Sequence, residues 1–291
     1  MLKLVLPKGS LEKPTLQLFE DADLGISRSS EVEYRGTIDD PRISDVRILR
    51  PQEIPGYVAE GLFDVGIAGR DLIEESDSDV VSLGTMQYSK NSAKPYRIVL
   101  AVAQDSPWQD VTDLPDGVRI STELPGLTRR FLEKAGVRAD IRLSHGATEA
   151  KVPEIADAVV DGTETGRALR AADLRILATI LTSYTEIFAN REAYADPQKR
   201  HAMVQIHTLL QGVMEARGKV LVKLNVARGE LDRVIAILPS MKSPTVSELF
   251  GEGGYAVEAV VQKVEINTLI PALKDAGATD IIEIPLAKIV H

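Results

Sequence analysis

The stretch DAVVDGTETGRALRAADL, residues 157–174, predicts a strand, a polar turn and a helix in direct succession. The apolar run at residues 158–160 is typical of a buried strand that ends at Asp161, and the composition of residues 167–172 favours a helix. A turn between these elements places backbone N–H groups at the positive end of a helix dipole. Units of this kind build α/β folds.

The turn contains donors that suit a phosphate group. Thr163 and Thr165 carry hydroxyls, Gly166 permits close approach of the backbone, and Arg167 can supply a fork of N–H donors. The acidic residues beside them suit a sugar diol or a magnesium ion. Many such turns contain Gly and Thr only for turn geometry and capping, so the loop alone leaves both interpretations open. Internal bonding of its amides would remove support for a phosphate site.

The composition excludes several classes of site and partner. The 291 residues include 34 Lys and Arg against 43 Asp and Glu, with 4% aromatic residues, which disfavours nucleic acid as a partner. Because the chain has no cysteine, it has no disulfide, thiolate nucleophile or thiolate metal site. No apolar run approaches the ~20 residues of a membrane span and no signal peptide is evident, so we expect a cytoplasmic protein without a membrane partner.

Residues 1–97 alternate short apolar runs with segments of helical composition. This alternation predicts a largely parallel sheet flanked by helices. We expect the helices to begin near Ser10, Pro51 and Asp71, and proline suits the first turn of a helix. The expected strands are residues 2–6, 45–49, 65–68 and 80–83.

A second series of α/β units fills residues 98–183, and a long amphipathic helix is expected at residues 197–218. We predict that residues 1–97 and 184–217 form one lobe and that residues 98–183 form another. From residue 218 the order becomes strand, helix, strand, strand, helix, strand, which matches a ferredoxin-like βαββαβ module over residues 218–291.

An ordered series of segments runs along nearly the whole chain: LVLPKGSL (4–11), RPQEIP (50–55), GLFDVGIAGRD (61–71), STELP (121–125), GATE (146–149), DGTETGRAL (161–169), LPSMKSPTV (238–246) and GATDI (277–281). In this order they resemble the long form of the ATP phosphoribosyltransferase family, the first enzyme of histidine biosynthesis. Three positions depart from the family pattern, since Ser10 stands where arginine is usual, Ala168 where threonine or serine is usual, and Ala68 where threonine is frequent.

The resemblance implies an α/β fold in which a two-lobed, periplasmic-binding-protein-like catalytic region precedes a C-terminal ferredoxin-like regulatory domain. It implies transfer of the 5-phosphoribosyl group of phosphoribosyl diphosphate to N1 of ATP, which gives N1-(5-phosphoribosyl)-ATP and pyrophosphate. This reaction needs no protein nucleophile, only alignment of the reactants and stabilisation of the leaving group. The implied cofactor is Mg²⁺, the implied inhibitor is histidine, and the implied assembly is a homohexamer built from dimers.

The resemblance also implies residues for each ligand. Asp161 and Glu149 are candidates for the ribose hydroxyls or for magnesium, although Asp161 could instead cap a helix and Glu149 could be a solvated loop residue. Arg50 could instead form a surface salt bridge, and Asp71 could cap a helix. The residues implied for phosphoribosyl diphosphate are Glu149, Asp161, Glu164, Thr165, Gly166, Arg167 and Ala168. Those implied for ATP are Lys8, Gly9, Arg50 and Asp71, and those implied for histidine are Ser243, Thr245 and Asp280.

Two other functions stay open on the sequence. Two α/β lobes also describe solute-binding proteins, so one alternative is a non-catalytic protein that binds a small anion. The other is a regulatory protein whose C-terminal module senses an amino acid, although this leaves the loop at residues 164–168 unexplained.

Overall fold

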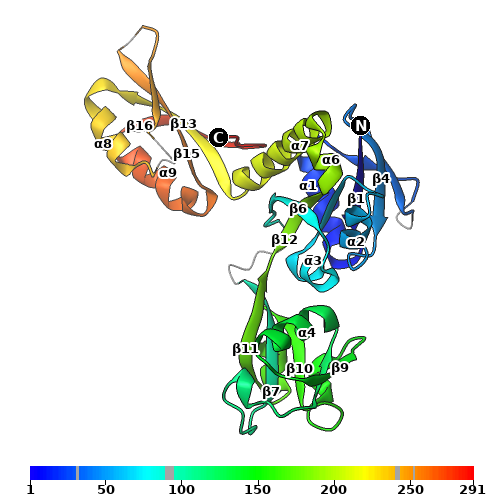
Figure 1. The fold of residues 1–291 in the computed structure, drawn as a ribbon. Helices are drawn as coiled ribbons and strands as arrows, with labels where there is room; N and C mark the ends of the chain where they lie inside the picture. Colours follow the sequence, from blue (N-terminus) through cyan, green and yellow to red (C-terminus); the bar gives the residue numbers. More distant parts are fainter. Residues whose placement is uncertain (31–32, 89–94, 240–242, 252) are drawn as a thin grey trace. The chain divides into compact units, whose positions relative to one another are not determined.

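The computed structural model describes residues 1–30, 33–88, 95–239, 243–251 and 253–291. The chain divides into two compact units, Met1–His207 and Thr208–His291 (Figure 1). The first unit contains a seven-stranded and a five-stranded sheet, and the second contains a four-stranded sheet. Within the described part of the chain, no helix has the length and apolar character needed to cross a membrane.

The first lobe is built on the seven-stranded sheet, which is mixed. Its three central strands are parallel, and the strands on either side of them run antiparallel to their neighbours. The prediction of a largely parallel sheet is therefore right only for the centre. The strands are, in spatial order, β2 (Ile26–Ser27), β3 (Arg35–Ile38), β4 (Ile43–Leu49), β1 (Leu2–Pro7), β5 (Val65–Gly69), β12 (Thr185–Asn190) and β6 (Val80–Thr85).

Three helices of this lobe follow the ends of the parallel strands. α1 (Glu12–Asp21) comes after β1 through a 3-10 turn, α2 (Ile54–Ala59) comes after β4, and α3 (Arg70–Ser76) directly continues β5. All three predicted helices are confirmed, with starts within a few residues of those expected. Because the carboxyl ends of parallel strands meet at one edge of a sheet, the loops before these helices gather at that edge.

The second lobe is the five-stranded sheet, and Figure 1 labels its helix α4 (Pro125–Lys134). α4 follows the strand at Val118–Thr122, and the short helix α5 (Arg167–Ala171) follows the strand at Ala158–Thr163. Apolar strand residues such as Leu100, Ile120 and Val160 are buried and form its core. The strands are, in spatial order, β11 (Leu174–Ser183), β7 (Tyr96–Ala103), β10 (Ala158–Thr163), β8 (Val118–Thr122) and β9 (Ala139–Leu143).

The two lobes meet where α3 approaches α4. The Glu75 carboxylate accepts hydrogen bonds from the amides of Gly126 and Leu127, at 2.9 and 2.8 Å, and thereby caps the first turn of α4. A Cβ on Gly126 would lie 2.6 Å from the Glu75 carbonyl oxygen, so the approach requires glycine. Arg130 donates to the carbonyl oxygen of Glu74. We call these contacts the α3–α4 latch.

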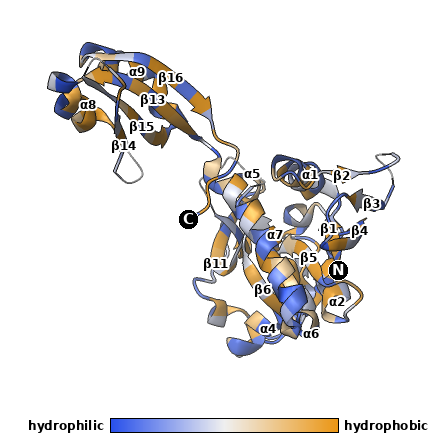
Figure 2. Ribbon diagram, turned by 90° about the horizontal axis from the view of Figure 1, so that it is seen from above, coloured by the Kyte–Doolittle hydropathy of each residue, from blue (hydrophilic) through white to orange (hydrophobic). Residues whose placement is uncertain are grey.

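The second unit confirms the predicted ferredoxin-like module. Adjacent strands are antiparallel, and the spatial order is β14-β15-β13-β16. Alternate residues of β13 are buried in one core with the helix residues Val234 and Leu273, and Figure 2 shows the hydrophobic colouring of β13 and β15. The elements are β13 (Lys219–Ala227), α8 (Leu231–Ile237), β14 (Thr245–Glu248), β15 (Gly254–Gln262), α9 (Ile266–Asp275) and β16 (Ala278–Pro285).

The long helix predicted before this module is α7 (Pro197–Ala216), which follows the short α6 (Arg191–Ala195). Figure 2 shows that α7 carries both hydrophobic and hydrophilic residues. Its apolar residues Met203, Ile206 and Leu210 are buried. The apolar stripe of this helix is therefore a packing surface.

Candidate active site

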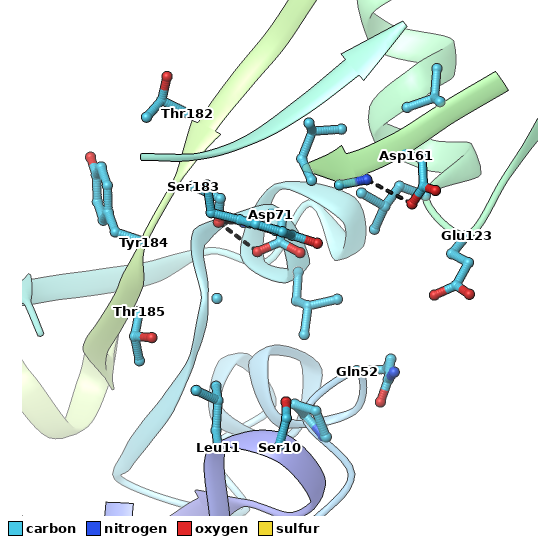
Figure 3. A pocket seen from close by; sticks show the side chains of 18 of the residues that line it. Ser10, Leu11, Gln52, Asp71, Glu123, Asp161, Thr182, Ser183, Tyr184 and Thr185 are labelled. Atoms are coloured by element: carbon cyan, nitrogen blue, oxygen red, sulfur yellow. Dashed lines mark hydrogen bonds between the residues drawn. The ribbon is translucent and has the colours of Figure 1, made fainter. Parts of the chain in front are cut away.

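A pocket of about 1030 Å³ lies in the first unit and is lined by residues of both lobes. The first lobe contributes the loops before its helices, and the second contributes residues of β7, β10 and the segment that leads into α4. The end of β11 and the start of β12 also line it, and Figure 3 shows their residues Thr182, Ser183, Tyr184 and Thr185. The charged or polar lining residues that matter below are Arg50, Asp71, Tyr96, Glu123 and Asp161.

Asp71 is fixed at the start of α3 by a residue of another strand. The Ser183 hydroxyl donates to an Asp71 carboxylate oxygen at 2.6 Å, and the Asp71 amide donates to the Ser183 oxygen at 3.1 Å (Figure 3). A Cβ on Gly69 would lie 2.2 Å from the Asp71 carboxylate, so the bent-back position of this side chain requires glycine. The N-cap residue of α3 is Gly69, and the alternative that Asp71 is only a helix cap is wrong.

Asp161 lies within β10, because this strand continues past the predicted end to Thr163. The alternative that Asp161 caps the following helix is therefore wrong, since the N-cap residue of α5 is Gly166. The half-buried Asp161 carboxylate accepts a hydrogen bond from the Gly162 amide at 2.7 Å. Burial raises the pKa of Asp161, and the charges of Glu149 and Glu123 raise it further. The ionised form of such a carboxylate is stabilised when a ligand supplies a hydrogen-bond donor or a cation.

The lining of the pocket is acidic. Among the described lining residues, three carboxylates, those of Asp71, Glu123 and Asp161, stand against one guanidinium, that of Arg50. A polyanionic ligand cannot bind such walls on charge alone, because like charges repel. The pocket therefore suits ligands that offer hydroxyl groups to the carboxylates or that bring cations with them.

The loop after β10 uses some of its donors internally. The Gly166 amide donates to the Thr163 hydroxyl at 2.8 Å, and the Arg167 amide donates to the Thr165 hydroxyl at 3.4 Å. Gly166 has a φ of 70°, which favours glycine. The Thr165, Arg167 and Ala168 side chains are exposed, and the amides of Thr165 and Ala168 find no hydrogen-bond acceptor among the described residues. The expected set of free amides is thus only partly present.

Comparison with known proteins gives a consistent result. A family model described as ATP phosphoribosyltransferase matches residues 50–212, and one described as HisG, C-terminal domain, matches residues 216–288. The ATP phosphoribosyltransferases of Desulforudis audaxviator and Pelotomaculum thermopropionicum are 47% and 46% identical over 289 residues, which is 99% of each chain. The chain belongs to the ATP phosphoribosyltransferase family.

A solved structure supports the same relationship. The ATP phosphoribosyl transferase (HisG:HisZ) complex from Thermotoga maritima contains a chain that is 28% identical with a TM-score of 0.62. The match covers 97% of that chain and 72% of this one, so the present chain is the longer. The predicted α/β fold is confirmed, and the chain is a phosphoribosyltransferase of the first step of histidine biosynthesis rather than a non-catalytic anion-binding protein.

Only some of the residues expected to bind the two substrates of this ATP phosphoribosyltransferase line the pocket. Arg50, Asp71 and Asp161 do, whereas Lys8, Gly9, Glu149 and residues 164–168 do not. The Lys8 ammonium lies 4.3 Å from the centre of the Tyr34 ring, and Gly9 has a φ of 89° at the start of the 3-10 turn before α1. Glu149 is near enough to Asp161 for its charge to raise the pKa of that carboxyl.

The residues expected to bind histidine do not meet within one chain. Thr245 lies on β14 and Asp280 on β16, which are opposite edges of the four-stranded sheet. Strands are spaced about 4.8 Å apart, so these edges are about 14 Å apart. Asp280 accepts a hydrogen bond from the Asn225 side-chain amide at 3.0 Å, and Ser243 is exposed just before β14. Residues 240–242 of the segment LPSMKSPTV lie outside the described residues.

Sequence reasoning did not single out most of the residues that line the pocket, among them Tyr96, Glu123 and Ser183. Glu123 directly follows the parallel strand β8, and its place after the carboxyl end of such a strand was a usable signal. Tyr96 and Ser183 stand at the start of one strand and the end of another. Nothing in their local sequence distinguishes them from ordinary strand residues.

Proposed function

We propose that the chain carries out its family's reaction in the pocket between the two lobes. N1 of ATP attacks the anomeric carbon of phosphoribosyl diphosphate, the bond from that carbon to the diphosphate oxygen breaks, and pyrophosphate leaves. The observation that carries the assignment is the meeting of Arg50 and Asp71 from one lobe with Asp161 from the other in one cavity. Such a cavity can hold two substrates with their reacting atoms aligned.

Each part of the substrates is assigned to residues whose side-chain chemistry suits it. We assign the ribose hydroxyls to Asp161, whose carboxylate accepts from the sugar while the positive charge on the ribose develops. The exposed Thr165 hydroxyl, the amides of Thr165 and Ala168, and the Arg167 side chain are assigned to the 5-phosphate. Arg50 is the charged donor of the lining for ATP or the departing diphosphate.

Mg²⁺ fits the donor chemistry of this site. The carboxylates of Asp161 and Glu149 are the oxygen ligands that Mg²⁺ prefers, and the ion needs only one or two of them when a diphosphate supplies the rest. In the described part of the chain, no three His, Asp or Glu side chains form a group that could hold a metal ion. Bound Mg²⁺ would neutralise charge on the leaving group.

Removal of Mg²⁺ should abolish turnover, because the acidic lining does not neutralise two polyanionic substrates. The assay mixes the protein with ATP, phosphoribosyl diphosphate and Mg²⁺ and follows the absorbance of the N1-alkylated adenine, with and without excess EDTA. Product formation should return when Mg²⁺ is added back. Binding of either substrate without turnover in complete buffer would contradict the proposed reaction.

Replacing Thr165 with valine should raise the KM for phosphoribosyl diphosphate about five-fold, because one neutral hydrogen bond contributes ~1 kcal/mol. The KM for ATP should stay within two-fold and serves as the internal control. Initial rates over a grid of both substrate concentrations separate the two constants. An equal rise in both would show that Thr165 does not belong to the phosphate site.

We propose that histidine inhibits the enzyme at the C-terminal module and that copies of the chain assemble into a homohexamer built from dimers. Because Thr245 and Asp280 occupy opposite edges of one sheet, a histidine site that uses both needs two chains. This arrangement would make inhibition depend on assembly. Light scattering with and without histidine measures the assembly directly.

Replacing Asp280 with asparagine should weaken inhibition by histidine about ten-fold, because a hydrogen bond to a charged group contributes ~1.5–3 kcal/mol. Asp280 has a φ of 49°, a conformation that asparagine tolerates, so the change removes charge with little strain. The histidine concentration for half-inhibition is the measurement, and kcat without histidine should not change. The helix-end variant Asp275→Asn is the control, and equal effects of the two would count against the site.

A further inference from the structure

Tyr96, the first residue of β7, lines the pocket and lies against Gly162 of β10. A Cβ built on Gly162 would lie 1.8 Å from the Tyr96 hydroxyl oxygen and 2.3 Å from the ring carbon that bears it. In the sheet, Gly162 is opposite Ile98, so the Tyr96 side chain reaches it diagonally on the same face. The phenol therefore occupies the space that any larger residue at position 162 would fill.

This contact explains why residue 162 is glycine. Unlike Gly166, whose φ is 70°, Gly162 has no positive φ that would require glycine for its backbone. Glycine in the middle of a strand weakens the strand, and an aromatic side chain on the neighbouring strand can cover the gap. Gly162 thus gives Tyr96 its place, and the Gly162 amide donates at 2.7 Å to the carboxylate of the preceding Asp161, which lines the same pocket.

The surroundings of Tyr96 keep its hydroxyl as a proton donor. Burial raises the pKa of Tyr96 to about 12, and the charges of Asp71, Asp161, Glu123 and Glu164 contribute to the rise. Near neutral pH the phenol is therefore always protonated. The carboxylates around it are acceptors when ionised, so the phenol places a protonated donor among several acceptors.

We propose that the Tyr96 hydroxyl, seated against Gly162, binds the ribose of phosphoribosyl diphosphate next to Asp161. The inference rests on the proposed function, in which Asp161 accepts from the sugar hydroxyls. A ribose hydroxyl both donates and accepts, so a carboxylate and a phenol that line one pocket can satisfy its two capacities. Tyr96 and Asp161 together fix the orientation of the sugar, and this sets how the anomeric carbon faces N1 of ATP.

The first test is the variant Tyr96→Phe, which keeps the ring over Gly162 and removes only the hydroxyl. The KM for phosphoribosyl diphosphate should rise about five- to ten-fold, while the KM for ATP should stay within two-fold. Tyr194→Phe, which changes a tyrosine on α6 outside the pocket lining, is the matched control and should behave as wild type. An unchanged KM for phosphoribosyl diphosphate in Tyr96→Phe, or an equal rise for ATP, overturns the inference.

The second test uses Gly162→Ala, because its Cβ cannot coexist with the Tyr96 phenol in its present place. We expect this variant to raise the KM for phosphoribosyl diphosphate at least as much as Tyr96→Phe does. In a protein that already carries Tyr96→Ala, adding Gly162→Ala should raise the KM for phosphoribosyl diphosphate by less than two-fold. An equally large effect in both backgrounds would show that Gly162 acts without Tyr96. Wild-type protein is assayed in parallel, and its failure to form product would reject the proposed function rather than this inference.

Discussion

Replacing Asp161 with asparagine should lower kcat/KM for phosphoribosyl diphosphate about 10- to 100-fold, because the carboxylate is a charged acceptor for the sugar and such bonds contribute ~1.5–3 kcal/mol. Asparagine has nearly the same shape and can still accept the Gly162 amide, which now donates at 2.7 Å. The backbone of β10 should therefore be undisturbed. The KM for ATP should change much less, and initial-rate kinetics with each substrate varied in turn measure both effects.

The same substitution should raise the thermal stability of the protein at neutral pH. Burial raises the folded-state pKa of Asp161 above its unfolded value, so the folded protein binds this proton more tightly. The stability contributed by that proton is present below the unfolded pKa of about 3.9 and is lost as pH rises through the folded-state pKa. Asparagine carries no charge to bury. The rise in melting temperature should therefore vanish in acid.

The pH dependence of activity follows from the same shift. If the ionised carboxylate of Asp161 binds the sugar, kcat/KM for phosphoribosyl diphosphate falls as pH drops through the raised pKa. Asp161→Asn should lose this acidic limb. Asp173→Asn, at an exposed position with a φ of 53° that asparagine tolerates, should leave both activity and stability unchanged. A less stable Asp161→Asn protein would mean that the carboxylate serves the fold.

Two of the expected carboxylates line the pocket: Asp161, which its own strand-and-turn segment singled out, and Asp71, which only the family resemblance implied. Asp71 follows the apolar strand β5, and Asp161 stands next to the apolar run of β10. The pattern Gly-Thr-Glu-Thr-Gly drew attention to the loop after β10, but two of its amides bind neighbouring threonine hydroxyls. Local composition shows which hydrogen-bond donors a turn contains. It cannot show which of these donors are already bonded to acceptors within the turn.

Contacts between distant strands lie beyond such reasoning. The approach of Tyr96 to Gly162 depends on the pairing of β7 with β10, and the bond between Ser183 and Asp71 joins β11 to α3. The mixed order of the first sheet has the same origin. Its strand β12 follows the whole second lobe in the sequence and yet pairs with β5 and β6 of the first lobe. Strand register and sheet order are set by the packing of the whole lobe, which no local window contains.

Replacing Glu75 with alanine should lower the free energy of unfolding by about 1–2 kcal/mol, the usual cost of losing a helix cap. The Glu75 carboxylate accepts the amides of Gly126 and Leu127 and favours the positive end of α4, so its removal leaves both donors without this partner. Glu75→Gln keeps one carbonyl oxygen and should give an intermediate loss. Glu133→Ala, on the exposed side of α4, is the matched control.

The α3–α4 latch should also affect both substrates together. α3 carries Asp71 at its start and Glu75 near its end, while Glu123 stands just before α4. Asp71 and Glu123 line the pocket from different lobes, so the latch sets the separation of these two walls. Glu75→Ala should therefore raise the KM for ATP and for phosphoribosyl diphosphate by similar factors, unlike Asp161→Asn. A stability loss with both constants unchanged would show that the latch holds α4 alone and does not set the width of the pocket.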